Sequence, residues 1–263
     1  MSPDSGDYNE FVADFYDPVY NNLRRNDIQF FVDCAIAAAG KTLELGCGTG
    51  RVLIPTARAG CEITGLDLSP FMLQKCREKL EKEPEAVQAR VKLVQADMTE
   101  FSLGEKFDLI TIPFRPFQHL ITVADQKACL ACVHKHLSQK GHFILDVFHP
   151  SIPRLTDPKY LMEMDNEPPV NLPQGSVLRR TVRTAAFHLD EQYNEIELIH
   201  YVKHPDGREE RLVHAFPMRY FFRYELEHLL TASGFKIVDF FGNYDRSPFT
   251  SESPEMIIIA QKS

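Results

Sequence analysis

The chain lacks several features that would narrow its function at once. No stretch of its 263 residues approaches the roughly 20 consecutive apolar residues that cross a bilayer. The first residues show neither the basic start nor the apolar core of a signal peptide, so we expect a cytoplasmic protein without a membrane partner. Basic residues are in the minority: 29 Lys and Arg stand against 37 Asp and Glu, for a net charge of −8. Nucleic-acid binders usually carry a basic surface, so we also expect no nucleic-acid partner.

A disulfide scaffold is another feature that the chain lacks. The six cysteines are scattered along the chain rather than gathered into the dense pattern of a disulfide scaffold. Cys129 and Cys132 form a C-x-x-C pair, but the pair lies inside an apolar helical pattern and has no second pair. Two buried apolar thiols are therefore favoured over a metal or redox site.

What the chain does contain is a regular alternation of strand and helix patterns up to residue 148. Short apolar runs predict strands at 41–45, 61–66, 91–95, 107–112 and 141–148. Helical spacing of apolar residues predicts helices at 26–39, 51–58, 69–83 and 119–137. This alternation is typical of βαβ units, so we expect an α/β fold with a parallel sheet.

The pattern changes after residue 149. Six prolines between residues 150 and 175 disfavour helices and central strands. Alternating polar and apolar residues then predict an antiparallel sheet from the runs 177–188, 194–203 and 209–222. A helix and two strands are expected at 224–233, 235–241 and 256–261. We divide the chain accordingly into a core (1–149), an antiparallel substrate cap (150–222) and C-terminal elements that complete the core (223–263).

The most informative segment surrounds three alternating glycines. A short apolar strand ends near Glu44 and is followed by Gly46, Gly48 and Gly50. Such a turn lets backbone N–H groups approach a ligand closely at the start of a helix. Dinucleotide sites place a further glycine where Arg51 stands, and the Gly-Lys-Ser/Thr of a P-loop is absent, so both of those patterns match poorly.

Two acids follow the next two predicted strands. Asp67 could accept two hydrogen bonds from a ribose diol, or it could serve the start of the following helix. Asp97 could accept from an adenine amino group while Met98 offers its backbone N–H, or it could be an ordinary turn acid. Leu68 and Met72 could enclose the purine or belong to the core.

Together these motifs resemble the class I S-adenosylmethionine-dependent methyltransferases that act on small molecules. The resemblance covers most of residues 10–148, including Ala96-Asp97-Met98 and the strand that starts at Phe107-Asp108. It implies a Rossmann-like seven-stranded sheet with S-adenosyl-L-methionine as cofactor and S-adenosyl-L-homocysteine as product. It also implies that Glu44 and the glycines hold the methionine end of the cofactor, with Ile112 among the other cofactor contacts.

Two further features resemble the amino-sugar N-methyltransferases of antibiotic pathways. They are the N-terminal segment that contains Tyr16 and Tyr20, and His119 after the fourth strand. The resemblance implies that Tyr16 covers the cofactor, that Tyr20 contacts the substrate, and that His119 orients or deprotonates the acceptor. The alternatives are a core or lid aromatic for Tyr16 and a helix-capping role for His119.

Three more residues are predicted to contact the substrate. Arg115, at the edge of the fourth strand, suits a carboxylate or phosphate group, or else it pairs with an acid of the cap. Phe117 lies beside it. Tyr244 lies in the loop between the last two strands, where a plain hairpin loop is the favoured interpretation. We expect no metal, because Asp146 stands without the acidic cluster that Mg²⁺-dependent catechol-type enzymes need.

The sequence therefore predicts a methyltransferase that acts on a nitrogen, or else an oxygen, of a small molecule. An amine must lose its proton before it attacks, which gives His119 a role. A non-catalytic or regulatory S-adenosylmethionine-binding protein on the same fold is the alternative, and a nicotinamide oxidoreductase comes third.

Overall fold

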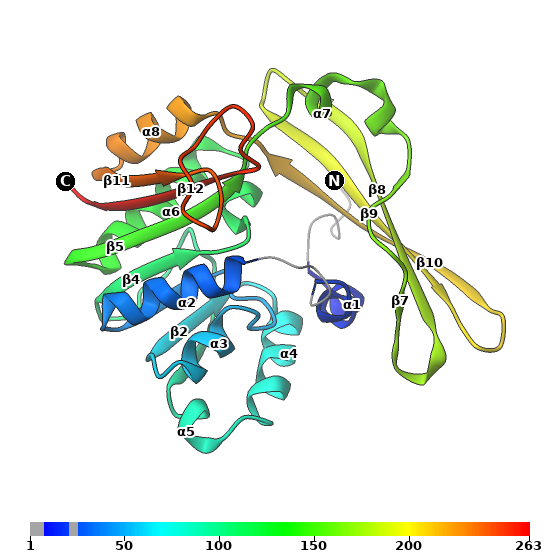
Figure 1. Cartoon of the computed structure of the whole chain (residues 1–263), viewed down its shortest axis with the longest axis horizontal. Coiled ribbons are helices and arrows are strands. Elements are labelled where there is room, and N and C mark those ends of the chain that lie inside the picture. Colours follow the sequence, from blue (N-terminus) through cyan, green and yellow to red (C-terminus); the bar gives the residue numbers. More distant parts are fainter. Residues whose placement is uncertain (1–7, 21–25) are drawn as a thin grey trace. The chain divides into compact units, whose positions relative to one another are not determined.

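The computed structural model describes residues 8–20 and 26–263. It divides into two compact units, each of which is described by itself (Figure 1). One unit combines the described residues of 1–24 with Pro150–Tyr220, and the other consists of Arg25–His149 and Phe221–Ser263. Within the described residues, no helix is long and apolar enough to span a membrane.

The larger unit is built on a seven-stranded sheet with the order β11-β12-β5-β4-β1-β2-β3. Its strands are β1 (Thr42–Leu45), β2 (Ile63–Asp67), β3 (Val91–Gln95), β4 (Phe107–Ile112), β5 (Leu137–Phe148), β11 (Phe235–Phe241) and β12 (Glu255–Lys262). Strands β1 to β5 pair in parallel, and β12 runs antiparallel to both of its neighbours. The strand order reverses between β1 and β4, and ligands bind such sheets at the carboxyl ends of the strands beside that reversal.

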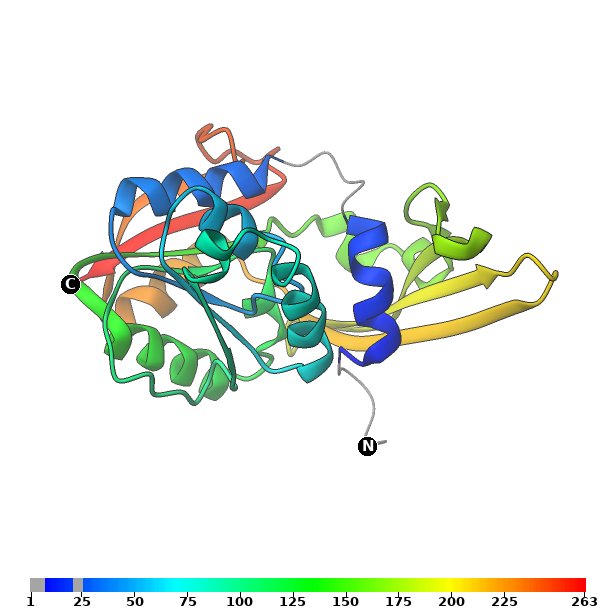
Figure 2. The same cartoon turned by 90° about the horizontal axis from the view of Figure 1, so that it is seen from below.

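Helices cover both faces of this sheet. Helix α2 (Asp27–Ala38) lies on one face, and α6 (Val123–His136) and α8 (Arg223–Ala232) lie on the other (Figure 2). The remaining connections include α3 (Leu53–Arg58), α4 (Pro70–Leu80) and α5 (Glu85–Gln88). Ile144 belongs to the same core cluster as Phe30 and Phe31 of α2, whereas the next residue, Leu145, packs in the cluster with Leu130 of α6. Neighbouring residues of a strand point to opposite faces, so a central strand needs an unbroken apolar run.

The smaller unit is an antiparallel sheet with the order β10-β9-β8-β6, in which β7 also pairs with β8. Its strands are β6 (Met164–Asp165), β7 (Val170–Asn171), β8 (Val177–His188), β9 (Tyr193–Lys203) and β10 (Glu209–Arg219). Helix α1 (Glu10–Tyr20) belongs to this unit because Val19 is buried against Leu178 and Val202. The division expected from the sequence places these residues in the core (1–149), whereas the structure groups them with Pro150–Tyr220.

Two local expectations are corrected by the structure. The proline-rich segment contains a short helix, α7 (Ile152–Thr156), and the 3₁₀ turns η2 (Pro158–Leu161) and η3 (Pro173–Gly175). Proline is tolerated there because it stands in the first turn, where the backbone N–H has no helical partner. Helix α6 begins at Val123 rather than at residue 119, since the Thr122 hydroxyl accepts the Asp125 N–H at 3.1 Å. His119 therefore ends the 3₁₀ turn η1 (Pro116–His119) and does not cap α6.

The packing of β5 can be tested at Phe143, which is fully buried with its ring 5.5 Å from that of Phe235. Phe143→Ala should lower the free energy of unfolding by about 3–5 kcal/mol, because truncation leaves a cavity. Urea denaturation measures the loss. Val238→Ala, at an exposed position of β11, is the control and should change stability by about 0.5 kcal/mol or less. Equal losses in the two variants would contradict this account of the core.

Candidate active site

The glycine turn between β1 and α3 is fastened to the end of β2. The N–H groups of Gly46 and Cys47 both donate to the Leu66 carbonyl, at 2.8 and 3.1 Å. All three glycines of the turn have positive φ, at 69°, 55° and 81°. A side chain on Gly46 would also come within 2.6 Å of Pro116. The turn therefore requires glycine both for its backbone conformation and for the approach of the loop that follows β4.

Asp67, the last residue of β2, holds the same turn through its side chain. Its Oδ2 accepts the Gly48 N–H at 2.7 Å, and its Oδ1 accepts the Ser69 N–H at 2.9 Å. Burial raises the pKa of Asp67, and these N–H donors act in the opposite direction. The hydroxyl of Ser69 caps α4 by accepting the Met72 N–H at 3.2 Å. A carboxylate has about four acceptor sites, so Asp67 retains capacity for further donors.

Glu44 is a buried acid on β1, with 2% of its surface exposed. Its Oε2 has no hydrogen-bond partner among the described residues. Burial raises the pKa of Glu44 to about 8; Arg51 works against this rise and Asp67 adds to it. A buried acceptor without a donor costs free energy. A ligand that brings an N–H group to this point would recover that cost.

Leu68 and Met72 follow β2, and Asp97 follows β3. Leu68 is 60% exposed although it is apolar, whereas Met72 is 3% exposed. A side chain on Gly48 would lie 3.2 Å from the Met72 methyl group, so Met72 packs beneath the turn. The Oδ1 of Asp97 accepts both the backbone N–H and the hydroxyl of Thr99, each at 2.7 Å. Asp97 thus makes the contact expected of an ordinary turn acid, and the residue as a whole is exposed.

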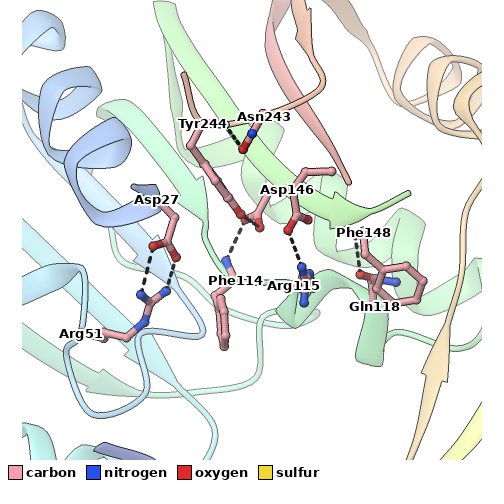
Figure 3. A network of polar contacts seen from close by, with 10 residues as sticks. Asp27, Arg51, Phe114, Arg115, Gln118, Asp146, Phe148, Asn243 and Tyr244 are labelled. Carbon is pink, nitrogen blue, oxygen red and sulfur yellow. Dashed lines mark hydrogen bonds and ion pairs between the residues drawn. The ribbon is translucent and has the colours of Figure 1, made fainter. Parts of the chain in front are cut away.

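Arg51 stands where the dinucleotide pattern has a glycine, and its side chain has a structural role. Its guanidinium donates to both carboxylate oxygens of Asp27, at 3.3 and 2.5 Å, and lies 4.4 Å from the centre of the Phe114 ring (Figure 3). The ion pair is almost entirely buried and joins the start of α2 to the glycine turn. In the sequence, Asp27 is recognisable only as an acid at the start of a predicted helix. Its ion pair with Arg51 could therefore not be predicted.

The loop after β4 is tied to two other strands (Figure 3). The Phe114 N–H donates to Asp146 Oδ1 at 2.7 Å, and the Tyr244 hydroxyl donates to Asp146 Oδ2 at 2.6 Å. Arg115 pairs with Glu255 at 2.5 Å. The expectation that an acid of the cap pairs with Arg115 is therefore wrong, because Glu255 is the first residue of β12. A substrate contact of Arg115 or Tyr244 stays a prediction.

The turn η1 carries the remaining predicted residues of this edge. His119 is partly exposed, and burial lowers its pKa to about 4, so the imidazole is neutral at pH 7. The side chain of Gln118 is buried and accepts the Phe148 N–H at 3.1 Å, which ties η1 to β5 (Figure 3). Phe117 is fully buried, with its ring 5.6 Å from that of Phe221. Phe117 thus packs in the core, and its predicted substrate contact stays a prediction.

The structure brings the predicted cofactor residues of the larger unit to one edge of the sheet. Glu44, the glycines, Asp67 and Asp97 accompany the adjacent strands β1, β2 and β3. Ile112 and Met98 belong to the core cluster or pack against it. In the smaller unit, the rings of Tyr16 and Tyr20 lie 4.5 Å apart, and the Tyr20 ring lies 4.7 Å from the Arg180 guanidinium carbon. The roles predicted for these two tyrosines stay predictions.

The glycine turn lies in a segment of the chain that matches a known protein family. Residues 42–141, from β1 into β5, match the family model described as a methyltransferase domain. The matched segment contains the glycine turn, Asp67, Asp97, Arg115 and His119. The resemblance seen in the sequence is thus confirmed for this segment.

Individual relatives extend the match to different degrees. Over 146 residues the chain is 30% identical to the dTDP-3-amino-3,6-dideoxy-alpha-D-glucopyranose N,N-dimethyltransferase of Streptomyces fradiae, an alignment that covers 53% of this chain and 54% of that protein. The chain spans 53–56% of the length of several such curated relatives. With the cypemycin N-terminal methyltransferase of a Streptomyces species, it shares 24% identity over 97% of both chains.

Solved structures establish the fold. The CcbJ methyltransferase from Streptomyces caelestis superposes with a TM-score of 0.76 at 23% identity, over 99% of both chains. CalS10, described as an amino pentose methyltransferase from Micromonospora echinaspora, gives a TM-score of 0.71 at 22% identity, over 98% of this chain and 99% of that one. The Rossmann-like class I methyltransferase fold predicted from the sequence is confirmed.

The burial of Glu44 predicts a dependence of stability on pH. Its pKa of about 8 lies above the ordinary value of 4.5, so its contribution to stability is fully present below pH 4.5 and is lost as the pH rises toward 8. That loss is at most about 5 kcal/mol. Glu44→Gln cannot ionise, so its melting temperature should fall less than that of the wild type between pH 5 and pH 8.5.

Thermal unfolding at the two pH values measures this difference. Glu81→Gln, at an exposed position after α4, is the control and should follow the wild type. A Glu44→Gln variant that also follows the wild type would show that Glu44 already has its usual pKa in the folded protein.

Proposed function

We propose that this chain, whose residues 42–141 match a methyltransferase domain, transfers a methyl group from S-adenosylmethionine to a nitrogen atom of a small molecule. The proposal rests on one observation, which is that the glycine turn, Glu44 and Asp67 belong to the same connected part of the structure. The Gly48 N–H lies 2.7 Å from the Asp67 carboxylate, so the turn and the acid form one rigid unit. The unit lies within the segment that matches a methyltransferase domain and at the carboxyl ends of parallel strands, where such sheets bind ligands, and both observations support a cofactor site here.

The residues present fit a ligand that combines an amino acid, a ribose and an adenine. Glu44 offers a buried carboxyl oxygen without a described partner, which suits an N–H group of the ligand. Asp67 has acceptor sites left for ribose hydroxyls. Leu68 supplies an exposed apolar surface for a planar ring, and Asp97 supplies an oxygen for its amino group. No metal is required in this arrangement.

Nitrogen is the proposed acceptor because two of the similar proteins are named as N-methylating enzymes. When bound, S-adenosylmethionine supplies a methyl group on a positively charged sulfur, which the lone pair of a neutral amine can attack. His119 is neutral at pH 7 because its pKa is about 4. A neutral imidazole can accept a hydrogen bond from an amine and orient it, but with this pKa it holds a proton poorly. We therefore assign His119 an orienting role.

Cofactor binding is the first test. Calorimetry with S-adenosylhomocysteine should give saturable binding, and Asp67→Ala should weaken it about 10- to 100-fold, because hydrogen bonds to the ligand and to the Gly48 N–H are lost together. Asp33→Ala, at an exposed position of α2, should leave the affinity unchanged. Mass spectrometry of a panel of small amines should then show the gain of one or two methyl groups. Binding without transfer to any acceptor would favour the non-catalytic alternative, and absence of binding would refute the proposal.

The role of His119 can be read from pH profiles. His119→Ala should lower kcat/KM about 10- to 100-fold, whereas His119→Gln should retain much of the activity, because an amide oxygen also accepts a hydrogen bond. A lowered pKa keeps the imidazole neutral above about pH 4. The acidic limb between pH 5 and 8 should therefore come from the amine itself and be the same in the wild type and in His119→Gln. Loss of that limb in the variant would show that His119 is the base.

A further inference from the structure

The methyl-transfer proposal gives no role to Asp146, one of the buried acids of the described residues. Asp146 is fully buried on β5, and both of its carboxylate oxygens are engaged. One accepts the Phe114 N–H and the other accepts the Tyr244 hydroxyl (Figure 3). Burial, with Glu255 nearby, raises the pKa of Asp146 to about 6, while Tyr244, Arg115 and the Phe114 N–H act in the opposite direction. Burying an acid costs free energy unless hydrogen bonds or ion pairs compensate for the lost hydration.

The backbone that Asp146 holds is strained. Phe114 and Arg115 have φ values of 65° and 75°, a conformation in which side chains clash with the backbone. Each such residue costs on the order of 1–3 kcal/mol and persists only where the surroundings over-determine it. Here the Phe114 N–H is bound by Asp146, and the Arg115 guanidinium is bound by Glu255. His119 follows Arg115 by four residues. The backbone conformation at Phe114 and Arg115 therefore determines the position at which η1 begins.

Phe114 also contacts residues on both sides of the loop after β4: Arg51 beside the glycine turn, and Asp146 on β5. Its ring lies beneath the guanidinium of Arg51, at 4.4 Å, and Arg51 follows the glycine turn directly. Its backbone is held from the other side by Asp146. Tyr244, the other partner of Asp146, packs its ring against Phe30 of α2, at 5.9 Å. The loop after β4 is thus fixed between the cofactor turn and the core.

We propose that Asp146 is a positioning residue, which holds the Phe114 backbone N–H and thereby sets the loop that presents His119 to the acceptor. This inference rests on the proposed function and deepens it. Asp146 acts through the loop rather than on the reacting atoms. Its removal should therefore affect the use of the acceptor far more than the binding of the cofactor.

The test compares three substitutions. Asp146→Ala removes both bonds, Tyr244→Phe removes only the hydroxyl, and Asp146→Asn keeps an oxygen that can accept the Phe114 N–H. Hydrogen exchange of the peptide that spans residues 113–120, followed by mass spectrometry, should be about 10-fold faster or more in Asp146→Ala. It should remain close to wild type in Asp146→Asn and be intermediate in Tyr244→Phe.

Kinetics supply the second measurement. In Asp146→Ala, kcat/KM for the acceptor should fall about 10-fold or more, while the Kd for S-adenosylhomocysteine stays within about 3-fold. Asp146→Asn should restore most of that loss. The control is Asp108→Ala, which removes a carboxylate at the other end of β4, where Asp108 accepts the Ser138 hydroxyl at 2.8 Å. It should change neither the exchange of residues 113–120 nor the kinetics.

Unchanged exchange in Asp146→Ala would overturn the proposal, as would a fall in cofactor affinity as large as the fall in kcat/KM. Should Asp146→Ala fail to fold, Asp146→Asn and Tyr244→Phe decide: equal exchange in both and in the wild type would refute the role. Failure of the proposed function would appear separately, as absence of S-adenosylhomocysteine binding in the wild type. The exchange measurement does not depend on that result.

Discussion

The hydrogen bond between the Gly48 N–H and the Asp67 carboxylate is the contact on which the candidate site depends. It joins the turn after β1 to the end of β2, at the edge of the sheet where the strand order reverses. The turn can reach Asp67 only because its glycines adopt positive φ, which other residues rarely do. Glu44 lies buried on the strand before this turn, so its pKa and its open oxygen both follow from the same local geometry.

A second set of constraints builds the side of the site that faces the acceptor. Asp146, Glu255 and Gln118 each bind a group of the chain in or beside the loop after β4. They come from two strands and a 3₁₀ turn, and all three side chains are buried. Charged and polar groups in such surroundings interact strongly, and a missing partner is costly. The loop is therefore held in one conformation although two of its residues are strained.

Local patterns sufficed for the strands of the larger sheet and for the acids beside the glycine turn. The apolar runs that became β1 to β5 could be located because buried parallel strands need unbroken apolar sequence. Asp67 and Asp97 could be chosen because each lies at or just past the end of such a strand. Long-range partners could not be chosen in this way. Asp27 and Arg51 are 24 positions apart, and Arg115 and Glu255 are 140 apart, and no local pattern connects them.

The sequence by itself determined the α/β order of the core, the glycine turn and the acids beside it, since these follow from spacing within a few residues. Only the tertiary structure decided which predicted residues remain available to a ligand. It placed Phe117 in the core, paired Arg115 with Glu255, and lowered the pKa of His119. Burial and ion pairing depend on what other segments bring to a residue. That information exists only once the chain has folded.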